Sequence, residues 1–554
     1  MLQRMFRVGI FSLAVVGLLL SLASSNLVAR GAGSGSLTIL HTQEHHGQVL
    51  PARPFRGNDF GGVSARATLV RQIRSEVGAD NMLLLDTGDI MVGTPIDSVF
   101  RGEPTVLAYN SMGYDAQNMG NHAFDFETTE NRLEILEGLA DYPIMAANVS
   151  GLNFDADPGF IKKTVGGLNV LIVGIGNVET PEIANPAPGT VFADPIQTVK
   201  DVIAAQGGDA DLIIAQVHED TFRDIDLFES VPELDVIIGG HTFGFRGMVT
   251  RGVFTADSVP TDPLPDQPTT LDNPNGVYVR AGEGPFKGRL GTTLGRLDLT
   301  VENGKVVKAS SDNIVVMPAN EFNLRTEDGA PAPEDLTALD PEVEGILQPF
   351  VDELDTRLSV PIGRSDVDLD GARENVRAKE TNLGDFIADV LRITQGTDIG
   401  MQNGGGIRTA IPAGDISLGD LLSIQPFGNT VVTFDITGAQ LLEAMENGVS
   451  QVENGAGRFP QISGMTLKWD SSQPAGSRVV EITVGGAALD EGKLYSVATN
   501  NFVAAGGDGY DVFTMAQNFF DTQFVDVDVL ADFVRSAGTI APTTDGRIVD
   551  VANP

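Results

Sequence analysis

The 554-residue chain contains no cysteine and only six histidines, and both scarcities restrict the sites that it can build. Without thiols, no disulfide can support the fold, and a transition-metal site must use imidazole, carboxylate or amide ligands. Those ligands suit Zn, Mn, Fe or Mg in a catalytic centre better than a structural zinc knot. All six histidines lie between His41 and His241, so the sequence places a metal site in the first half of the chain.

Positive charge is also scarce. The chain has 36 Lys and Arg residues against 75 Asp and Glu residues, which gives a formal net charge of −39. This balance argues against nucleic-acid backbones and anionic membranes as partners. If the substrate is itself an anion, metal ions and a few arginines must overcome the negative field locally.

One long apolar run stands at the start of the chain. Arg4 and Arg7 precede residues 8–22, and small residues with plausible cleavage points after Ser25 or Ala29 follow them. This layout is typical of a secretory signal, so residues 1–29 are predicted to direct export to the periplasm or the extracellular space. An uncleaved membrane anchor is the alternative, and no stable membrane insertion is expected after cleavage.

The length of the chain favours two domains with an α/β architecture. Residues 36–339 alternate short apolar strands with amphipathic stretches, and the strands end in polar clusters. Residues 340–361 carry apolar residues at helical spacing after Asp340-Pro341 and are expected to form a connecting helix. Residues 362–551 would form the second domain, in which Asn382 is expected to cap one helix and Thr437 to open another with a capping box.

Five polar segments follow predicted strands in the first domain, where buried parallel strands place their functional loops. The segments are 41–47 (HTQEHHG), 86–89 (DTGD), 120–125 (GNHAFD), 218–220 (HED) and 239–244 (GGHTFG). Two divalent ions commonly share a bridging carboxylate, a role that suits Asp89. Glu44 and His46 could hold one ion with it. The other candidate ligands, for the second ion, are Asn121, His218 and His241.

A single residue of this kind proves little, because a lone Asp or Asn at a strand end is more often a turn former. The metal prediction depends on five segments agreeing in order and position. His122 and Asp125 form an adjacent acid pair beside the proposed ions. His41 and His45 are interpreted as supporting or structural residues.

Together these segments resemble the calcineurin-like metallophosphoesterase domain of the secreted 5'-nucleotidase family, whose pattern reads HTNDxHG, DxGD, GNHEFD, a strand followed by His, and GGHxH. The resemblance implies a four-layer α/β/β/α sandwich that holds two divalent ions, Zn, Mn or similar. It assigns Glu44, His46 and Asp89 to one ion and the other three ligands together with Asp89 to the second. His122 would stabilise the transferring phosphoryl group, and Asp125 would orient His122.

The chain departs from the family pattern at four positions. Gln43 replaces Asn, Glu44 replaces Asp, and Ala123 replaces Glu. Phe243 stands where the family has His, Gln or Asn, and a phenyl ring cannot bind a metal. Because Glu44 and Phe243 both bear on the first ion, the sequence leaves open whether that ion binds.

The second domain resembles the 5'-nucleotidase carboxy-terminal domain, a smaller α/β domain, and its motifs are close to intact. They are 381–389 (TNLGDFIAD), 403–408 (NGGGIR), 425–429 (QPFGN), 457–464 (GRFPQISG) and 499–513 (TNNFVAAGGDGYDVF). The glycine-rich turn would let backbone amides approach a ligand, and an arginine fork would follow for phosphate. The predicted substrate-binding residues are Arg377, Asn403, Gly405, Gly406, Arg408, Phe427, Phe502 and Asp508.

Phe427 and Phe502 would clamp the base by stacking, and Asp508 could accept hydrogen bonds from ribose hydroxyls. The sequence therefore predicts an exported, metal-dependent hydrolase of nucleotide phosphoesters with a small nucleotide as its partner and no nucleic acid. Two alternatives stay open: a nucleotide-binding protein with an inactive metal site, and a phosphoesterase for cyclic nucleotides, nucleoside di- or triphosphates, or nucleotide sugars. Oligomeric state and metal identity are not determined by the sequence.

Overall fold

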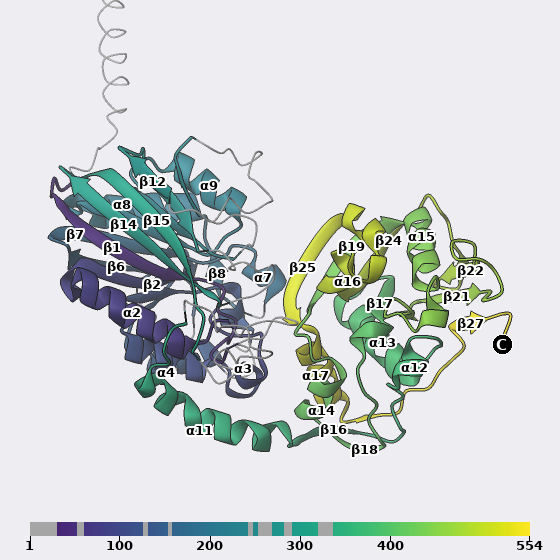
Figure 1. The fold of residues 1–554 in the computed structure, drawn as a ribbon. Helices are drawn as coiled ribbons and strands as arrows, with labels where there is room; N and C mark the ends of the chain where they lie inside the picture. Colours follow the sequence, from purple (N-terminus) through teal and green to yellow (C-terminus); the bar gives the residue numbers. More distant parts are fainter. Residues whose placement is uncertain are drawn as a thin grey trace, which may run out of the picture.

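The computed structural model describes residues 30–51, 60–125, 131–152, 158–184, 186–241, 247–252, 269–281, 291–319 and 336–553. The predicted signal segment 1–29 and Phe243 lie outside the described residues. Within those ranges, no helix is long and apolar enough to cross a membrane. The described elements form two halves, and the helix α11 (Pro341–Leu358) runs between them (Figure 1).

The first half contains two large sheets. One sheet consists, in spatial order, of β12 (Thr269–Asp272), β15 (Lys305–Val315), β14 (Thr293–Glu302), β1 (Gly35–Thr42), β2 (Met82–Asp86), β3 (Ala116–Asn118) and β4 (Ile144–Met145). The other consists of β11 (Gly247–Thr250), β13 (Val277–Arg280), β10 (Val236–Gly239), β9 (Leu212–Val217), β7 (Leu168–Ile175) and β6 (Phe160–Val165). The strands β1 to β4 are mutually parallel, as are β7, β9, β10 and β13.

The two sheets face each other across a shared apolar core, and helices cover their outer faces. Leu83 and Leu85 of β2 point into the core between the sheets, whereas Leu84 points outward to the helices. Successive strand residues face opposite sides, so a strand buried on both faces reads as an unbroken apolar run. The outer helices are α2 (Val63–Val77), α3 (Pro95–Phe100), α4 (Glu103–Met112), α6 (Arg132–Leu139), α7 (Thr180–Ile183), α8 (Pro195–Gln206) and α9 (Thr221–Ser230).

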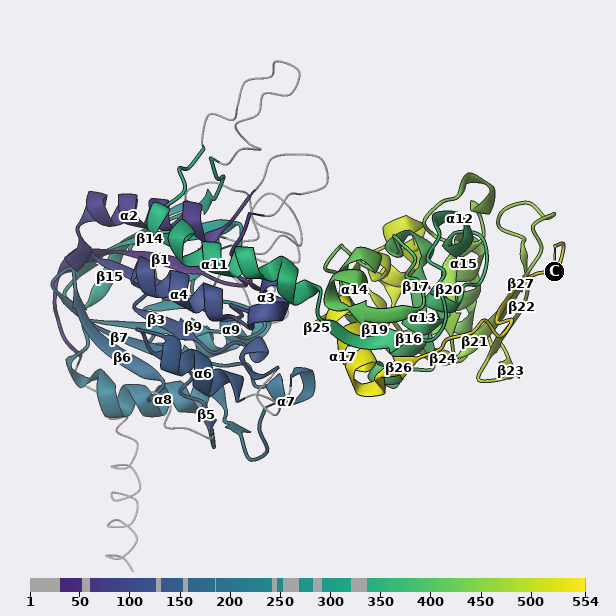
Figure 2. The ribbon, with the colours of Figure 1, turned by 90° about the horizontal axis from the view of Figure 1, so that it is seen from below.

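Figure 2 shows α2 and α8 on opposite sides of the sheets, which completes the expected four-layer α/β/β/α sandwich. A further pair of short strands, β5 (Val149–Ser150) and β8 (Val191–Phe192), pairs beside this sandwich.

The connecting helix α11 begins as predicted, because the Asp340 carboxylate accepts the amide N–H groups of Glu342 and Val343 and Pro341 occupies the first turn.

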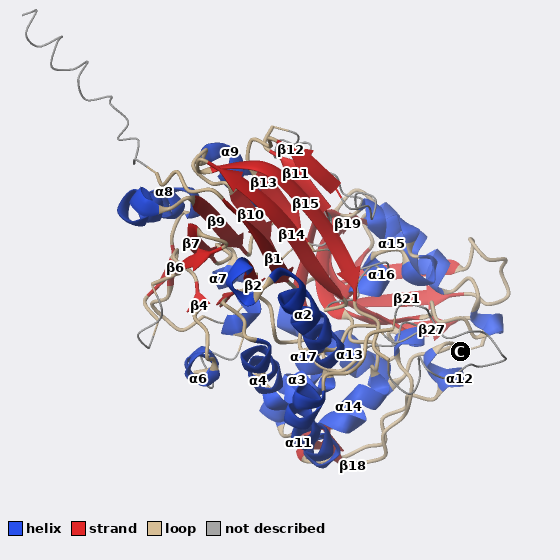
Figure 3. Ribbon diagram, turned by 60° about the vertical axis from the view of Figure 1, so that its left-hand side comes forward, coloured by secondary structure: helices blue, strands red, loops and turns tan. Residues whose placement is uncertain are grey.

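The second half is a smaller α/β unit whose main sheet consists of β20 (Pro460–Ser463), β17 (Ile399–Asn403), β24 (Leu494–Asn500), β19 (Thr430–Thr437) and β25 (Gln517–Val525). Two small sheets flank it: β18 (Gly414–Ser417), β16 (Pro361–Ser365) and β26 (Thr539–Ile540), and β23 (Ala487–Ala488), β22 (Val479–Val484), β21 (Met465–Trp469) and β27 (Ile548–Asp550). The helices, drawn blue in Figure 3, are α12 (Arg373–Val376), α13 (Asn382–Gln395), α14 (Leu418–Ile424), α15 (Gly438–Gly448), α16 (Asn501–Ala504) and α17 (Asp526–Ala537).

Two helix starts were predicted in this half, with different outcomes. Thr437 and Gln440 form the predicted capping box at the start of α15. The prediction for α13 was wrong by one residue, because the hydroxyl of Thr381, and not the side chain of Asn382, accepts the amide N–H of Gly384. Asn382 instead accepts the amide N–H of Asp370 and so attaches the helix to the preceding loop.

The two halves meet along β25. In Figures 1 and 2 this strand faces the first half, whereas α12 lies on a more distant part of the second half. The glycine turn after Phe427 also approaches the first half, since a Cβ on Gly428 would lie 3.7 Å from the carbonyl oxygen of Gly93. The strand β25 therefore lies against the first half, where Gln523 and Phe524 contact His122 in the turn after β3.

Candidate metal centre and nucleotide pocket

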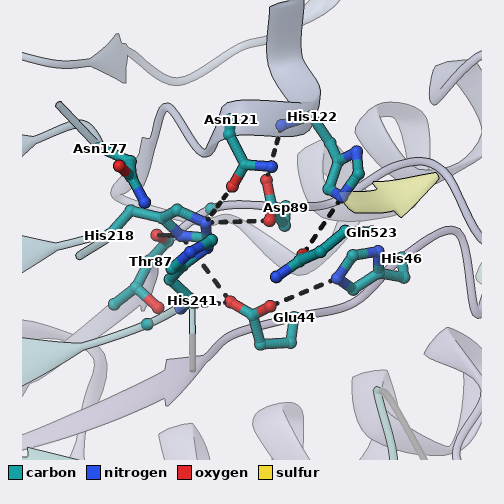
Figure 4. Close-up of polar contacts among 12 residues, drawn as sticks. Glu44, His46, Thr87, Asp89, Asn121, His122, Asn177, His218, His241 and Gln523 are labelled. Atoms are coloured by element: carbon teal, nitrogen blue, oxygen red, sulfur yellow. Dashed lines mark hydrogen bonds and ion pairs between the residues drawn. The ribbon is translucent and has the colours of Figure 1, made fainter. Parts of the chain in front are cut away.

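Five loops converge at one edge of the sandwich, as the parallel strand order requires. Glu44 and His46 follow β1, Asp89 follows β2, and Asn121 follows β3. His218 and His241 follow β9 and β10 of the other sheet. Figure 4 shows these side chains pointing toward a common centre, and all six are at least 94% buried, since none exceeds 6% exposure.

The backbone at this centre is strained. Glu44, His46, Asp89 and His241 have φ values of 48°, 46°, 53° and 68°, in the left-handed region that non-glycine residues rarely adopt. Such conformations cost of order 1–3 kcal/mol each and cluster at functional sites. Four of the six predicted metal ligands therefore occupy positions that packing alone would not favour.

The first group of ligand atoms comes from His46, Asp89 and His122, whose nearest donor atoms all lie within 4.8 Å of one another. His46 donates its Nδ1–H to the carbonyl oxygen of Val92 at 2.7 Å, which leaves the Nε2 lone pair directed at the centre. Glu44 Oε2 lies 3.3 Å from that Nε2. The other oxygen of Glu44 accepts the amide N–H of His241 at 2.6 Å, so only one carboxylate oxygen stays available to an ion.

The second group consists of Asp89, His218 and His241, again within 4.8 Å. His218 donates Nδ1–H to the carbonyl of Thr87 at 2.8 Å, and its Nε2 lies 2.9 Å from Asp89 Oδ2 and 3.2 Å from Asn121 Oδ1. His241 Nδ1 is buried without a hydrogen-bond partner. Histidines oriented through one ring nitrogen, with the other left free, are typical of metal ligands.

His122 and Asp125 are in direct contact, with 2.6 Å between Nδ1 and Oδ2. Burial disfavours the imidazolium, but the carboxylates of Asp125 and Asp89 outweigh it and raise the pKa of His122 to about 10. These carboxylates therefore favour the imidazolium form of His122, whose Nε2 is the ring nitrogen that does not contact Asp125. The arrangement fixes a proton donor beside the candidate metal ligands.

The centre is electrostatically suited to cations. Burial opposes ionisation of Asp89, but the charges of His218 and His122 outweigh it and hold the pKa of Asp89 far below its ordinary value. The same carboxylate, with Glu44, raises the pKa of His218 to about 9 against the effect of burial. Paired imidazole and carboxylate donors with an unpartnered His241 nitrogen fit divalent metal ions of the Zn or Mn type.

His41 and His45 stay outside both ligand groups. Burial lowers the pKa of His41 to about 4, and its ring lies over Gly295 of β14. The ring of His45 lies 5.8 Å from that of Tyr109, and its Nδ1 is 3.4 Å from the Arg66 guanidinium. Both positions agree with the structural interpretation of these residues.

A second constellation lies in the second half, around the glycine-rich turn that follows β17. Asn403 donates its side-chain N–H to Asp508 Oδ2 at 2.7 Å, and Asn500 donates to Asn403 Oδ1 at 3.1 Å. A Cβ on Gly405 would lie 2.9 Å from the Cα of Gly457, and one on Gly406 would lie 2.1 Å from Gln402 Nε2. Gly405 therefore allows two backbone segments to approach closely, whereas a side chain at position 406 would first have to displace the Gln402 amide.

Two arginines and two phenylalanines complete this second constellation. The Arg408 guanidinium lies 5.5 Å from the ring centre of Phe427 and donates to the carbonyl of Gly405. Burial lowers the pKa of Arg377, and the charges of Arg373 and Arg408 lower it further. Phe427 and Phe502 are 48% and 47% exposed, unusual for large aromatic side chains. The structure thus brings all eight predicted substrate-binding residues together.

The sequence did not indicate one residue at the metal centre, Gln523 of β25. Its Oε1 lies 3.3 Å from His122 Nε2, although 401 positions separate the two residues in the chain. No local motif marks Gln523, because it reaches the centre only through the contact between the two halves. The backbone of Gln523 has a positive φ of 61°, which only the structure reveals.

Comparison with known proteins gives a consistent result. Residues 361–515 match the family model described as the 5'-nucleotidase C-terminal domain. The chain is 31% identical over 536 residues to protein UshA of Escherichia coli, covering 91% of this chain and 92% of that protein. It is also 32% identical over 568 residues to the trifunctional nucleotide phosphoesterase protein YfkN of Bacillus subtilis, and this match spans 94% of the chain but only 35% of that much longer protein.

Among solved structures, the 5'-nucleotidase precursor of Thermus thermophilus is 32% identical, with a TM-score of 0.52 and coverage of 94% of this chain and 100% of that one. The matches extend over both halves and include both constellations. The chain therefore belongs to the 5'-nucleotidase family, whose members are hydrolases acting on phosphoester bonds.

Proposed function

We propose that this protein hydrolyses nucleotide phosphoesters to a nucleoside and phosphate, with a centre for two divalent ions in residues 36–339 and nucleotide recognition in residues 362–551. The observation that carries the proposal is the pair of ligand groups that share Asp89, one with His46 and one with His218 and His241. A shared carboxylate between two groups is the arrangement expected of a two-metal phosphoesterase. Predicted export through residues 1–29 would place the activity outside the cytoplasm.

Each residue of the centre has a distinct part in the proposed reaction. Bound divalent ions would lower the pKa of water and neutralise charge on the phosphoryl oxygens. His122, which is fixed by Asp125 through Nδ1, would donate its Nε2–H to a phosphoryl oxygen as negative charge develops there. Glu44, His46, Asp89, Asn121, His218 and His241 are the proposed metal ligands. The identity of the ions is proposed as Zn or Mn.

In the second half, the cluster of Arg377 and Arg408 would bind phosphate, and Phe427 and Phe502 would hold the base between their exposed rings. Asp508 has one oxygen on Asn403 and would use the other for a ribose hydroxyl. Stacking tolerates different bases, so we expect several nucleotides to bind.

The strand β25, and not α12, which precedes Arg377, faces the first half in this structure. We therefore propose that the second half turns about α11 to bring bound nucleotide to the ions. A crosslink that fixes the two halves should abolish turnover of AMP. Unchanged turnover in the crosslinked protein would contradict the movement.

One observation favours a second candidate, a nucleotide-binding protein without hydrolytic activity. One of the two Glu44 oxygens accepts the amide N–H of His241. The first ion therefore has few ligand atoms among the described residues. The deciding experiment is a phosphate-release screen across AMP, ADP, UDP-glucose and a cyclic nucleotide, with Zn, Mn, Mg and Ca added to EDTA-treated protein. Release that depends on the ion supports the enzyme. AMP binding with no release under any ion would support the binding protein.

A further inference from the structure

The side chain of Gln523 enters the metal centre from the second half of the chain. Figure 4 shows its amide group among His122, His46 and Glu44, which all belong to the first half. Gln523 Oε1 lies 3.3 Å from His122 Nε2, and the ring of the next residue, Phe524, lies 6.5 Å from the His122 ring. The Gln523 amide therefore lies beside His122, a member of the first ligand group.

The local structure of β25 is built to project this residue. The pairing of β25 with β19 shifts register between Thr430 and Val432, which is the signature of a bulge. Asp521 accepts the amide N–H of Gln523 at 2.9 Å and the hydroxyl of Thr430 at 3.0 Å, and this network holds the turn. The positive φ of Gln523 is costly for a residue with a Cβ, and such strain persists only where surrounding contacts impose it.

The number of ligands that a divalent ion requires indicates a role for the Gln523 amide. A Zn-type ion takes four ligands. The residues that the sequence assigns to the first ion offer one oxygen of Glu44, His46 Nε2 and a shared oxygen of Asp89, whereas His122 is held by Asp125 as a proton donor. Phe243 offers none, since a phenyl ring carries no donor atom. An amide oxygen is an accepted ligand of divalent ions, and Gln523 is the amide that the structure places at this group.

We propose that Gln523 is a metal ligand that the second domain supplies to the ion held by His46 and Asp89, so that this ion fastens the two domains in the arrangement seen here. The inference rests on the proposed metal-dependent function. Gln523 also occupies the side of His122 that would face a phosphoryl group. Substrate and Gln523 therefore compete for one place, and the domains must separate at β25 before hydrolysis.

Ion binding and domain docking are then thermodynamically linked, because a ligand supplied only by the docked state binds the ion only in that state. The chain contains no cysteine, so two introduced cysteines can carry a donor and an acceptor dye without competing thiols. Ile135→Cys and Val480→Cys use side chains that are 42% and 58% exposed, one in each half. Adding Zn to the metal-free labelled protein should narrow the energy-transfer distribution to one docked state.

The decisive variants are Gln523→Leu, which removes the donor atom at similar size, and Gln523→Glu, which supplies a stronger oxygen ligand. Gln517→Leu is the matched control, since Gln517 lies on the same strand and is exposed. Ions are titrated calorimetrically into EDTA-treated protein and counted by mass spectrometry. We expect Gln523→Leu to weaken one ion at least about tenfold and to lose the Zn-induced docking, the scale typical of changes around a metal.

Gln523→Glu should retain both ions, and Gln517→Leu should match the unmodified protein. Equal affinities for both ions in Gln523→Leu and the control would overturn the proposal, even if the variant loses its contact with His122. Phosphate release from AMP is measured on the same samples. If the unmodified protein releases phosphate only with ions, and Gln523→Leu binds those ions with unchanged affinity, then Gln523 is not a metal ligand but the proposed hydrolysis stands. If Gln523→Leu binds an ion more weakly and the unmodified protein releases no phosphate, then Gln523 is a metal ligand but the proposed hydrolysis is wrong.

Discussion

The candidate metal centre and the candidate nucleotide pocket differ in construction, although both depend on loops at strand ends. The metal centre gathers residues from five loops and two sheets, and four of its six predicted ligands have left-handed backbones. In the pocket, among the eight predicted residues, only Asp508 is a non-glycine residue with a positive φ. Both sites join distant segments of the chain, but left-handed backbones are frequent only among the predicted metal ligands.

The difference extends to charge. Buried carboxylates and imidazoles dominate the centre, where the imidazoles lower the pKa of Asp89 and the carboxylates raise the pKa of His122 and His218. The pocket instead gathers arginines beside exposed aromatic rings. The two sets of residues therefore differ in their chemistry, and we expect that each can be disrupted without the other.

The largest expected effect is the loss of AMP turnover when the candidate metal centre is altered. Asp89→Ala removes the carboxylate common to both ligand groups, so turnover of AMP should fall at least about 10³-fold, beyond the loss of a single transition-state contact. AMP affinity measured by calorimetry should stay within about twofold, because the pocket is untouched. A variant that lost AMP binding to the same extent as turnover would contradict the separation of the two sites.

An intermediate effect is expected from the pocket. Phe427→Ala removes one stacking face, worth about 1–3 kcal/mol, and should raise the KM for AMP roughly 5- to 150-fold with a smaller change in kcat. Hydrolysis of p-nitrophenyl phosphate, which needs no base recognition, serves as the control and should be unchanged. If both substrates lost activity equally, Phe427 would not be specific to the base.

The smallest effect concerns a buried carboxylate that lacks the imidazole partners of the metal centre. Burial raises the pKa of Asp526, at the start of α17, to about 8, far above its value of about 4 in an unfolded chain. The unfolded state therefore loses its proton first, and the free energy of unfolding should fall as pH rises from about 4 to 8. Asp526→Asn mimics the neutral acid and keeps the acceptor for the Val527 amide.

Urea unfolding should show Asp526→Asn more stable than the unmodified protein at pH 8, by at least about 1 kcal/mol, with the two nearly equal near pH 4. Identical pH profiles would show that Asp526 is ionised in the folded protein. Such a result would remove the contrast with Asp89, whose pKa the imidazoles lower despite equal burial.

Much of this organisation is readable in the sequence. Apolar runs such as Leu83 to Leu85 predict buried strands because adjacent residues pack on both faces, and the polar segments after them mark the functional edge. The glycine-rich turn at Gly405 is a local feature, so the sequence of that segment predicts it. The structure brings the predicted site residues together, and their catalytic and binding roles stay predictions.

Other features could not be read from the sequence because they depend on contacts between distant segments. Gln523 reaches His122 only through the docking of β25 on the first half. The hydrogen bond from the His241 amide N–H to one Glu44 oxygen forms because two loops from different sheets meet. At α13 the error was small, since Thr381 and Asn382 are both good capping residues and only geometry distinguishes them.

The most direct test of metal-dependent hydrolysis is phosphate release from AMP by EDTA-treated protein as Zn or Mn is titrated back, with bound ions counted at each point. The account predicts no release from metal-free protein and activity that rises with ion occupancy. Protein that binds AMP and two ions yet releases no phosphate, or that releases phosphate equally without ions, would contradict it.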